Sequence, residues 1–343
     1  MRPVIRQFAP ILAALALPLL ASCAALEELS KKLESVQERA AAQPPVDRVF
    51  VANESSNSVS VVDVTNMALL RTITLPTKGA HDLAMTRDGK RLFVSNLLSG
   101  SVSVIDVPTN QVIADIPTGN RCHSLALSGD ERQLWVVNIG ENNVSIIDVA
   151  RLRILGTIPV GKVPGHVRFR KDGRYAYVTS HEEELVSVID TSTQSVVKTI
   201  PVGKLPHFLI ASPDGRYLWG GNTGGSEVYV IDTTTNERVA SVTVGPKPQH
   251  IGFGMRGMFG PFAYVAVEGA NEVVVIDTKP GAYKIIDRIK VGPKPNGIGA
   301  SREGGRIYVS TQGEDDLYVV DTGTHRIIGT IRVGMKPVGV LPF

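Results

Sequence analysis

Seven aspartates, each at the end of a short apolar run, recur along this chain at a nearly constant interval. The intervals between successive aspartates are 43, 42, 42, 42, 45 and 44 residues. Each run is rich in Val and Ile, which favours a β-strand. A period in the low forties built from strands is typical of a β-propeller, in which each repeat forms one four-stranded blade. The seven residues are Asp63, Asp106, Asp148, Asp190, Asp232, Asp277 and Asp321.

The repeat around Asp190 shows the four strands of one blade. Strands are expected over residues 174–179, 185–190, 196–202 and 207–212, with Gly, Pro and polar residues between them. The first repeat begins at Val49, which aligns with the second strand of the other blades. The last segment, residues 338–343, aligns with their first strand. We therefore expect an all-β, seven-bladed propeller over residues 47–343. Its ring closes where the C-terminal strand joins the N-terminal blade, which hides two sheet edges.

Several motifs are shared with a known family. Tyr177-Val-Thr-Ser180, Leu134-Trp-Val-Val-Asn138 and Ser212-Pro-Asp-Gly-Arg216 stand at equivalent places in their repeats. In these motifs, residues 46–343 resemble the YVTN-type β-propeller repeats of bacterial and archaeal surface and periplasmic proteins. That family is functionally broad, so the resemblance implies the fold and leaves the activity open.

The N-terminus predicts secretion and a lipid anchor. Arg2 and Arg6 precede an apolar stretch over residues 8–20, and Leu20-Ala-Ser-Cys23 matches the lipoprotein cleavage pattern. We expect residues 1–22 to be a signal peptide and Cys23 to carry the lipid, such as palmitate. Ala24 favours the outer membrane over the inner membrane. Residues 23–46 are expected to form a helical or flexible stalk that ends at Pro44-Pro45.

Composition excludes several classes of partner and cofactor. Removal of the signal peptide lowers the formal net charge from +3 to +1, and no basic cluster indicates nucleic acid binding. The sequence has no Cys-x-x-Cys-His motif, which excludes covalent c-type haem. With Cys23 lipidated, Cys122 is the single remaining thiol. The propeller is expected to be monomeric.

The turns that enter the first strand of each blade contain five of the seven histidines. In a propeller these turns meet at the mouth of the central channel. His81, His123 and His207 share one position, whereas His166 and His250 come one residue later. Each turn also contains one cation: Lys78, Arg121, Lys162, Lys204, Lys247, Lys294 and Lys336.

Three interpretations of this mouth remain open. The imidazoles can bind a metal or a non-covalent haem, similar to the histidine ring that holds copper in the nitrous oxide reductase propeller. Against this, five histidines are fewer than such a cluster needs, and their register is split three to two. The cations and imidazoles can instead receive an anion. The simplest interpretation is that these are polar turn residues, so no cofactor is predicted.

Other sites are weaker. His181-Glu-Glu-Glu184 is one of several acidic connectors that can be solvated rim charges or a cation site. The inner strands contain no Asp or Glu, and Asp82 alone flanks one of them, so a lactonase-like hydrolase lacks its carboxylate ligands. Two lengthened turns on the opposite face carry apolar residues that can dock an envelope protein or be tolerated insertions: Met255, Met258, Phe259 and Tyr283.

Taken together, these features favour a lipid-anchored propeller of the cell envelope that acts as a non-catalytic binding platform. The first alternative is a redox or cofactor-handling protein that uses the histidines at the channel mouth. The second is a lactonase-like hydrolase.

Overall fold

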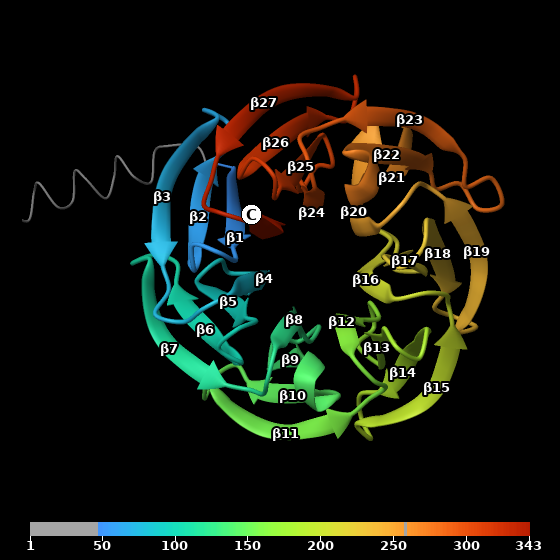
Figure 1. Cartoon of the computed structure of the whole chain (residues 1–343). Helices are drawn as coiled ribbons and strands as arrows, with labels where there is room; N and C mark the ends of the chain where they lie inside the picture. Colours follow the sequence, from blue (N-terminus) through green and yellow to red (C-terminus); the bar gives the residue numbers. More distant parts are fainter. Residues whose placement is uncertain (1–46, 257–258) are drawn as a thin grey trace, which may run out of the picture. The chain divides into compact units, whose positions relative to one another are not determined.

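The computed structural model describes residues 47–256 and 259–343, which form seven four-stranded antiparallel sheets around a central channel (Figure 1). The all-β, seven-bladed propeller expected from the sequence is confirmed. The predicted signal peptide, Cys23 and the stalk lie outside the described residues, as does Met258. No helix in the described part of the chain is long and apolar enough to cross a membrane.

Four concentric sets of strands make up the ring. The innermost strands are β4 (Ala80–Met85), β8 (Cys122–Leu127), β12 (Pro164–Phe169), β16 (Pro206–Ala211), β20 (Pro248–Arg256), β24 (Pro295–Ala300) and β28 (Pro337–Pro342). The second set is β1 (Arg48–Asn53), β5 (Arg91–Asn96), β9 (Gln133–Asn138), β13 (Tyr175–Ser180), β17 (Tyr217–Asn222), β21 (Phe259–Val267) and β25 (Arg306–Thr311). The third set is β2 (Ser58–Asp63), β6 (Ser101–Asp106), β10 (Asn143–Asp148), β14 (Leu185–Asp190), β18 (Glu227–Asp232), β22 (Glu272–Asp277) and β26 (Asp316–Asp321). The outermost strands are β3 (Ala68–Thr74), β7 (Gln111–Pro117), β11 (Arg153–Pro159), β15 (Ser195–Pro201), β19 (Glu237–Thr243), β23 (Ile285–Lys290) and β27 (Arg326–Arg332).

The ring closes as expected from the sequence. β28 pairs with β1, so that Phe50 lies opposite Leu341. The backbone N–H of Arg48 donates to the carbonyl of Phe343 at 3.1 Å, and the N–H of Phe343 donates back at 2.8 Å. The C-terminal residues thus supply the innermost strand of the first blade, and the inner edge of β1 is paired like that of the equivalent strand in the other six blades.

The repeated aspartates have a structural role at the end of each third-set strand. Oδ1 of Asp190 accepts hydrogen bonds from the backbone N–H groups of Ser192 at 2.9 Å and Thr193 at 3.2 Å. Asp63 accepts from Thr65 and Asn66 in the same way. A short carboxylate that reaches its own backbone two or three residues later favours a tight turn. This turn explains why the period is marked by Asp.

The core lies between neighbouring blades and is formed mainly by the second and third sets of strands. Trp135, Trp219 and Tyr177 are among its largest fully buried side chains. Alternate residues of each strand face the two neighbouring sheets, so almost every side chain of these strands is buried. This packing holds the inner strands rigidly around the channel. Two three-residue 3-10 turns interrupt the connectors, η1 (Ile139–Glu141) and η2 (Glu268–Ala270).

Candidate metal centre

Every innermost strand carries a β-bulge near its beginning. In β12, Pro164 pairs with Ser180 and Val167 pairs with Val178, so two residues, Gly165 and His166, lie opposite Thr179 alone. The same shift occurs at the equivalent place in the other six blades. A bulge of this kind re-aims side chains and is common beside functional sites. In five blades, one of its two residues is a histidine.

The bulges resolve the offset between the two groups of histidines. His81, His123 and His207 occupy the first bulge position, whereas His166 and His250 occupy the second. The sequence register suggested that this three-to-two split weakens a metal site. The split does not keep the side chains apart, because the five rings from both bulge positions lie in one cluster.

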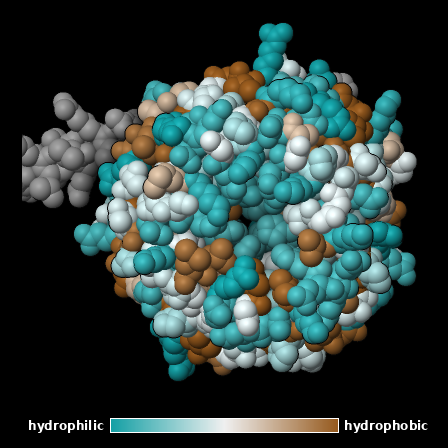
Figure 2. Space-filling model, viewed as in Figure 1, coloured by the Kyte–Doolittle hydropathy of each residue, from teal (hydrophilic) through white to brown (hydrophobic). Residues whose placement is uncertain are grey.

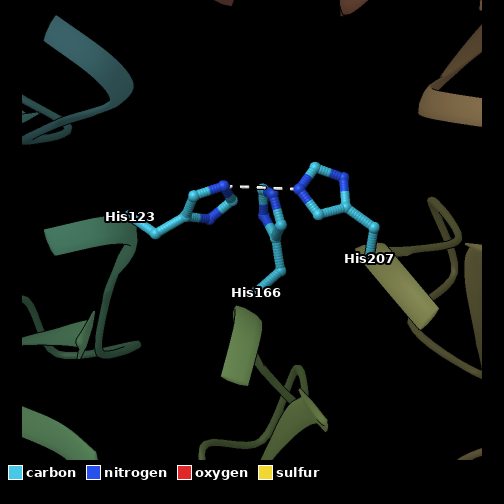
Figure 3. Close-up of side chains that lie close together, drawn as sticks. All are labelled: His123, His166 and His207. Atoms are coloured by element: carbon cyan, nitrogen blue, oxygen red, sulfur yellow. Dashed lines mark hydrogen bonds between the residues drawn. The ribbon is translucent and has the colours of Figure 1, made fainter. Parts of the chain in front are cut away.

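The imidazoles form a compact cluster. Ring centroids are 4.1 Å apart for His81 and His123, 5.1 Å for His123 and His207, and 5.0 Å for His166 and His207. His250 follows at 5.3 Å from His166. His123, His166 and His207 point toward one another (Figure 3), and one ligand nitrogen from each lies within 4.8 Å of the other two.

Hydrogen bonding leaves several of these nitrogens free. Nδ1 of His123 donates to the carbonyl of Gly165 at 3.0 Å, which turns the lone pair of Nε2 toward the cluster. That Nε2 accepts a hydrogen bond from the Nε2–H of His207 at 3.3 Å. Both ring nitrogens of His166, Nδ1 of His207 and Nε2 of His250 are buried and have no hydrogen-bond partner among the described residues. Buried polar atoms are rarely left unpaired in proteins, so these nitrogens are available to a ligand or to ordered water.

Electrostatics keep the cluster neutral. Burial, followed by repulsion from neighbouring imidazoles, lowers the pKa of His81, His123, His166 and His207 well below its usual value. Burial and the charge of Arg168 lower the pKa of His250 to about 3. Neutral imidazole is the form that binds metal ions, so these side chains are ready to act as ligands near pH 7.

Hydroxyl groups fix the spacing between neighbouring bulges. Oγ1 of Thr179 accepts from the backbone N–H of His166 at 2.8 Å and donates to the carbonyl of His207 at 2.9 Å. Ser95 similarly accepts from the N–H of Asp82 and donates to the carbonyl of His123. Each hydroxyl therefore joins the bulge of its own blade to the first bulge residue of the next blade.

A sixth histidine belongs to the same region and was not identified from the sequence. The ring of His181 lies 5.3 Å from that of His207, and its Nε2 has no hydrogen-bond partner among the described residues. Burial and the charge of Arg121 lower the pKa of His181 to about 4. Because His181 begins an acidic connector, the sequence grouped it with the rim charges.

The seven predicted cations surround the cluster without entering it. All of them are exposed except Lys336, which is half-buried and paired with Glu54. Lys247 lies 3.7 Å from Glu268. Lys336 also contributes to the lowered pKa of His81. Among the seven, Lys336 and Arg121 thus make protonation of a nearby histidine less favourable. The exposed members are Lys78, Arg121, Lys162, Lys204, Lys247 and Lys294.

A cavity of about 360 Å³ adjoins the cluster within the channel. Asp82, Arg168, Phe208 and His250 line it together with apolar side chains. The sequence placed Asp82 beside an inner strand, whereas the structure places it within β4. It is the only carboxylate among the residues that line the cavity. The residues that line the cavity therefore include no pair of carboxylates of the kind expected for a lactonase-like hydrolase. Figure 2 shows the central hollow, bordered mainly by hydrophilic residues.

The predicted partner loops are structured turns. β20 ends at Arg256 and β21 begins at Phe259, and the N–H of Met255 donates to the carbonyl of Gly304 at 2.7 Å. The ring of Tyr283 packs edge-on against Trp219 at 5.6 Å. Met258 and the side chain of Phe259 lie outside the described part. Docking of a partner here stays a prediction.

Comparisons with known proteins place the chain in a family. Similar solved structures include hydrazine synthase from Kuenenia stuttgartiensis, with 21% identity and a TM-score of 0.69 over 78% of this chain and 90% of that one. The periplasmic gluconolactonase PpgL of Pseudomonas aeruginosa has 18% identity and a TM-score of 0.71, and the match covers 87% of this chain and 99% of PpgL. The dihydro-heme d1 dehydrogenase NirN in complex with DHE has 17% identity and a TM-score of 0.66 over 87% and 75%. At these identities, the likeness shows the fold alone. No curated protein matches the sequence. The family model of YNCE-like β-propellers matches residues 1–343, and the chain therefore belongs to the YNCE-like β-propeller family.

Proposed function

We propose that this propeller binds one transition-metal ion in its channel through His123, His166 and His207. The observation that carries the proposal is the convergence of three ligand nitrogens within 4.8 Å. A tetrahedral ion with bonds of about 2.0–2.1 Å separates its ligand nitrogens by about 3.4 Å. The Nε2 atoms of His123 and His207 are already 3.3 Å apart.

The donor set indicates which metals fit. Imidazole nitrogens without a carboxylate favour Zn²⁺ or copper over Mg²⁺ or Ca²⁺. Three protein ligands also leave a coordination position for a small molecule, as in catalytic zinc sites. A purely structural role for the histidines fits less well, because an unpaired buried polar group costs about 1–3 kcal/mol. The geometry thus favours the cofactor-handling alternative. The non-catalytic platform stays a prediction from the sequence.

The metal proposal is tested by titration of the purified protein with Zn²⁺ and with Cu²⁺ in the presence of a competing chelator. We expect one tight equivalent. Single variants H123A, H166A and H207A should weaken it by more than the roughly 10–100-fold effect of residues that only orient ligands. H325A is the matched control, because His325 is a histidine bonded to Asp287 far from the channel. Equal binding by all four variants contradicts the proposal.

We also propose that the protein is anchored in the cell envelope through a lipid on Cys23. The support is the signal-peptide pattern that ends at Leu20-Ala-Ser-Cys23 and the propeller fold shared with a periplasmic protein. Growth with labelled palmitate should label the wild-type protein and not C23S. A C23S variant that remains labelled and in the membrane fraction contradicts the anchor.

A further inference from the structure

The channel continues beyond the histidine cluster into a space with different chemistry. Side chains two residues past the second bulge position return to the channel face because of the strand pleat. Six of these seven residues are small or apolar and one is charged. They are Ala84, Ala126, Arg168, Ile210, Gly252, Gly299 and Leu341, and all except Ala84 and Ala126 line the cavity. A single cation therefore faces a largely apolar cavity.

Arg168 has unused hydrogen-bonding capacity. Its Nη1 donates to the backbone carbonyls of Val167 at 2.8 Å and Leu125 at 3.4 Å. Nε and Nη2 donate to no described residue, and no described carboxylate lies within 4.0 Å of the guanidinium. A guanidinium has five N–H donors, so three remain for a ligand. An arginine held inside a protein normally has an anionic partner.

The charge of Asp82 acts on Arg168, but Asp82 makes no direct hydrogen bond to it. Oδ1 of Asp82 accepts from the N–H of Leu83 at 2.9 Å. Oδ2 accepts from Oγ of Ser124 at 2.9 Å and from the N–H of Leu125 at 3.3 Å. Asp82 is thus held by its own neighbours, and its charge still reaches the cavity. A ligand with two negative charges is disfavoured there, whereas a monoanion can pair with Arg168.

The walls beside Arg168 favour an apolar ligand body. Its guanidinium carbon lies 5.6 Å from the ring centroid of Phe208. Phe208 stacks on His250 with centroids 4.1 Å apart and planes inclined by 18°. His250 is 4% exposed, and its Nε2 has no hydrogen-bond partner among the described residues. These rings form a flat surface next to the cation. The cavity of about 360 Å³ has room for about a dozen water-sized groups.

We infer that the cavity binds a small organic monocarboxylate, with its carboxylate on Arg168 and its apolar body against Phe208 and His250. The planar fork of arginine matches a carboxylate with two parallel hydrogen bonds. This inference goes beyond the proposed metal site and does not require the metal, although His250 brings the two together. A ligand held here lies next to the histidine cluster.

The test is calorimetric titration of the chelator-treated full chain with hydrocinnamate. Its neutral analogue hydrocinnamamide and inorganic phosphate serve as comparison ligands. We expect hydrocinnamate to bind with Kd below about 1 mM, since ligands of this size reach that range in a fitted pocket. The amide and phosphate should bind at least about tenfold more weakly, because the amide lacks the negative charge and phosphate lacks the apolar body. Equal binding of acid and amide, or stronger binding of phosphate, overturns the inference.

Variants separate this site from the metal site. R168M should weaken hydrocinnamate binding by at least about tenfold. The affinity of R168K should lie between those of the wild type and R168M, because lysine keeps the positive charge but cannot form two parallel hydrogen bonds. R174K is the matched control, since Arg174 is exposed and lies 5.2 Å from the Tyr175 ring. R168M should still bind Zn²⁺, whereas metal-free H123A should still bind hydrocinnamate, because no ring contact joins His123 to Phe208. Unchanged hydrocinnamate binding by R168M overturns this inference and leaves the metal proposal standing.

Discussion

The buried histidines predict a steep loss of stability in mild acid. His81, His123, His166 and His250 are at most 7% exposed, and all have a pKa well below the usual 6.5. Below pH 6.5 the unfolded chain takes up protons that the folded chain does not bind. The free energy of unfolding therefore falls as the pH decreases, and it continues to fall until the folded pKa of each group is reached.

The size of this effect follows from the four groups. An imidazole that titrates at 6.5 only when unfolded lowers the free energy of unfolding by about 1.4 kcal/mol between pH 7.5 and 5.5. These four groups alone lower it by about 5 kcal/mol, a large part of the 5–15 kcal/mol typical of a folded protein. His207 and His181, whose pKa is also lowered, add to this fall. Carboxylates titrate near pH 4, so this window isolates the histidines.

The assay is urea unfolding of chelator-treated protein at the two pH values, followed by the fluorescence of the buried Trp135 and Trp219. H166L should reduce the difference between the two pH values by about 1.4 kcal/mol, because one titrating group is removed. A free energy of unfolding that is equal at pH 7.5 and 5.5 would refute the neutral, buried state of the cluster.

Three further predictions test the surroundings of the site. T179V should lower the free energy of unfolding by about 2–3 kcal/mol, because two buried backbone groups lose their partner; T193V, at an exposed turn, should change it by less than about 0.5 kcal/mol. Equal thermal melting of the two variants would count against the hydroxyl bridge. Burial raises the pKa of the Cys122 thiol to about 12, so a thiol reagent should label it only after denaturation; rapid labelling of the folded protein would contradict this. Deletion of residues 337–343 opens the ring, and circular dichroism should then show no cooperative melting; an unchanged melting curve would mean that closure by β28 is dispensable.

The fold could be predicted from the sequence because its repeat is marked by residues with a local structural role. Asp190 and its six equivalents end the third strand of each blade and fix a turn through their own backbone hydrogen bonds. These interactions are confined to a few residues, so they leave a regular pattern in the chain. Ring closure followed from the register of the first and last segments, and the β28–β1 pairing confirms it.

The site could be predicted only in part, because its geometry depends on contacts between blades. The sequence identified five histidines, and it did not show the bulges that bring both registers into the channel. It placed His181 among rim charges, since its immediate neighbours are glutamates. Arg168 stands between Val167 and Phe169 in an apolar strand, and its unpaired donors become apparent only once Asp82 is seen to be bonded elsewhere.

The central claim is that a metal ion lies among His123, His166 and His207. The most direct test is an anomalous difference map from crystals of the protein grown with Zn²⁺, recorded on both sides of the zinc absorption edge. The proposed centre predicts one dominant peak in the channel, within about 2.0–2.1 Å of a ring nitrogen from each of the three histidines. Zinc peaks only at the acidic rim, with none in the channel, would contradict it.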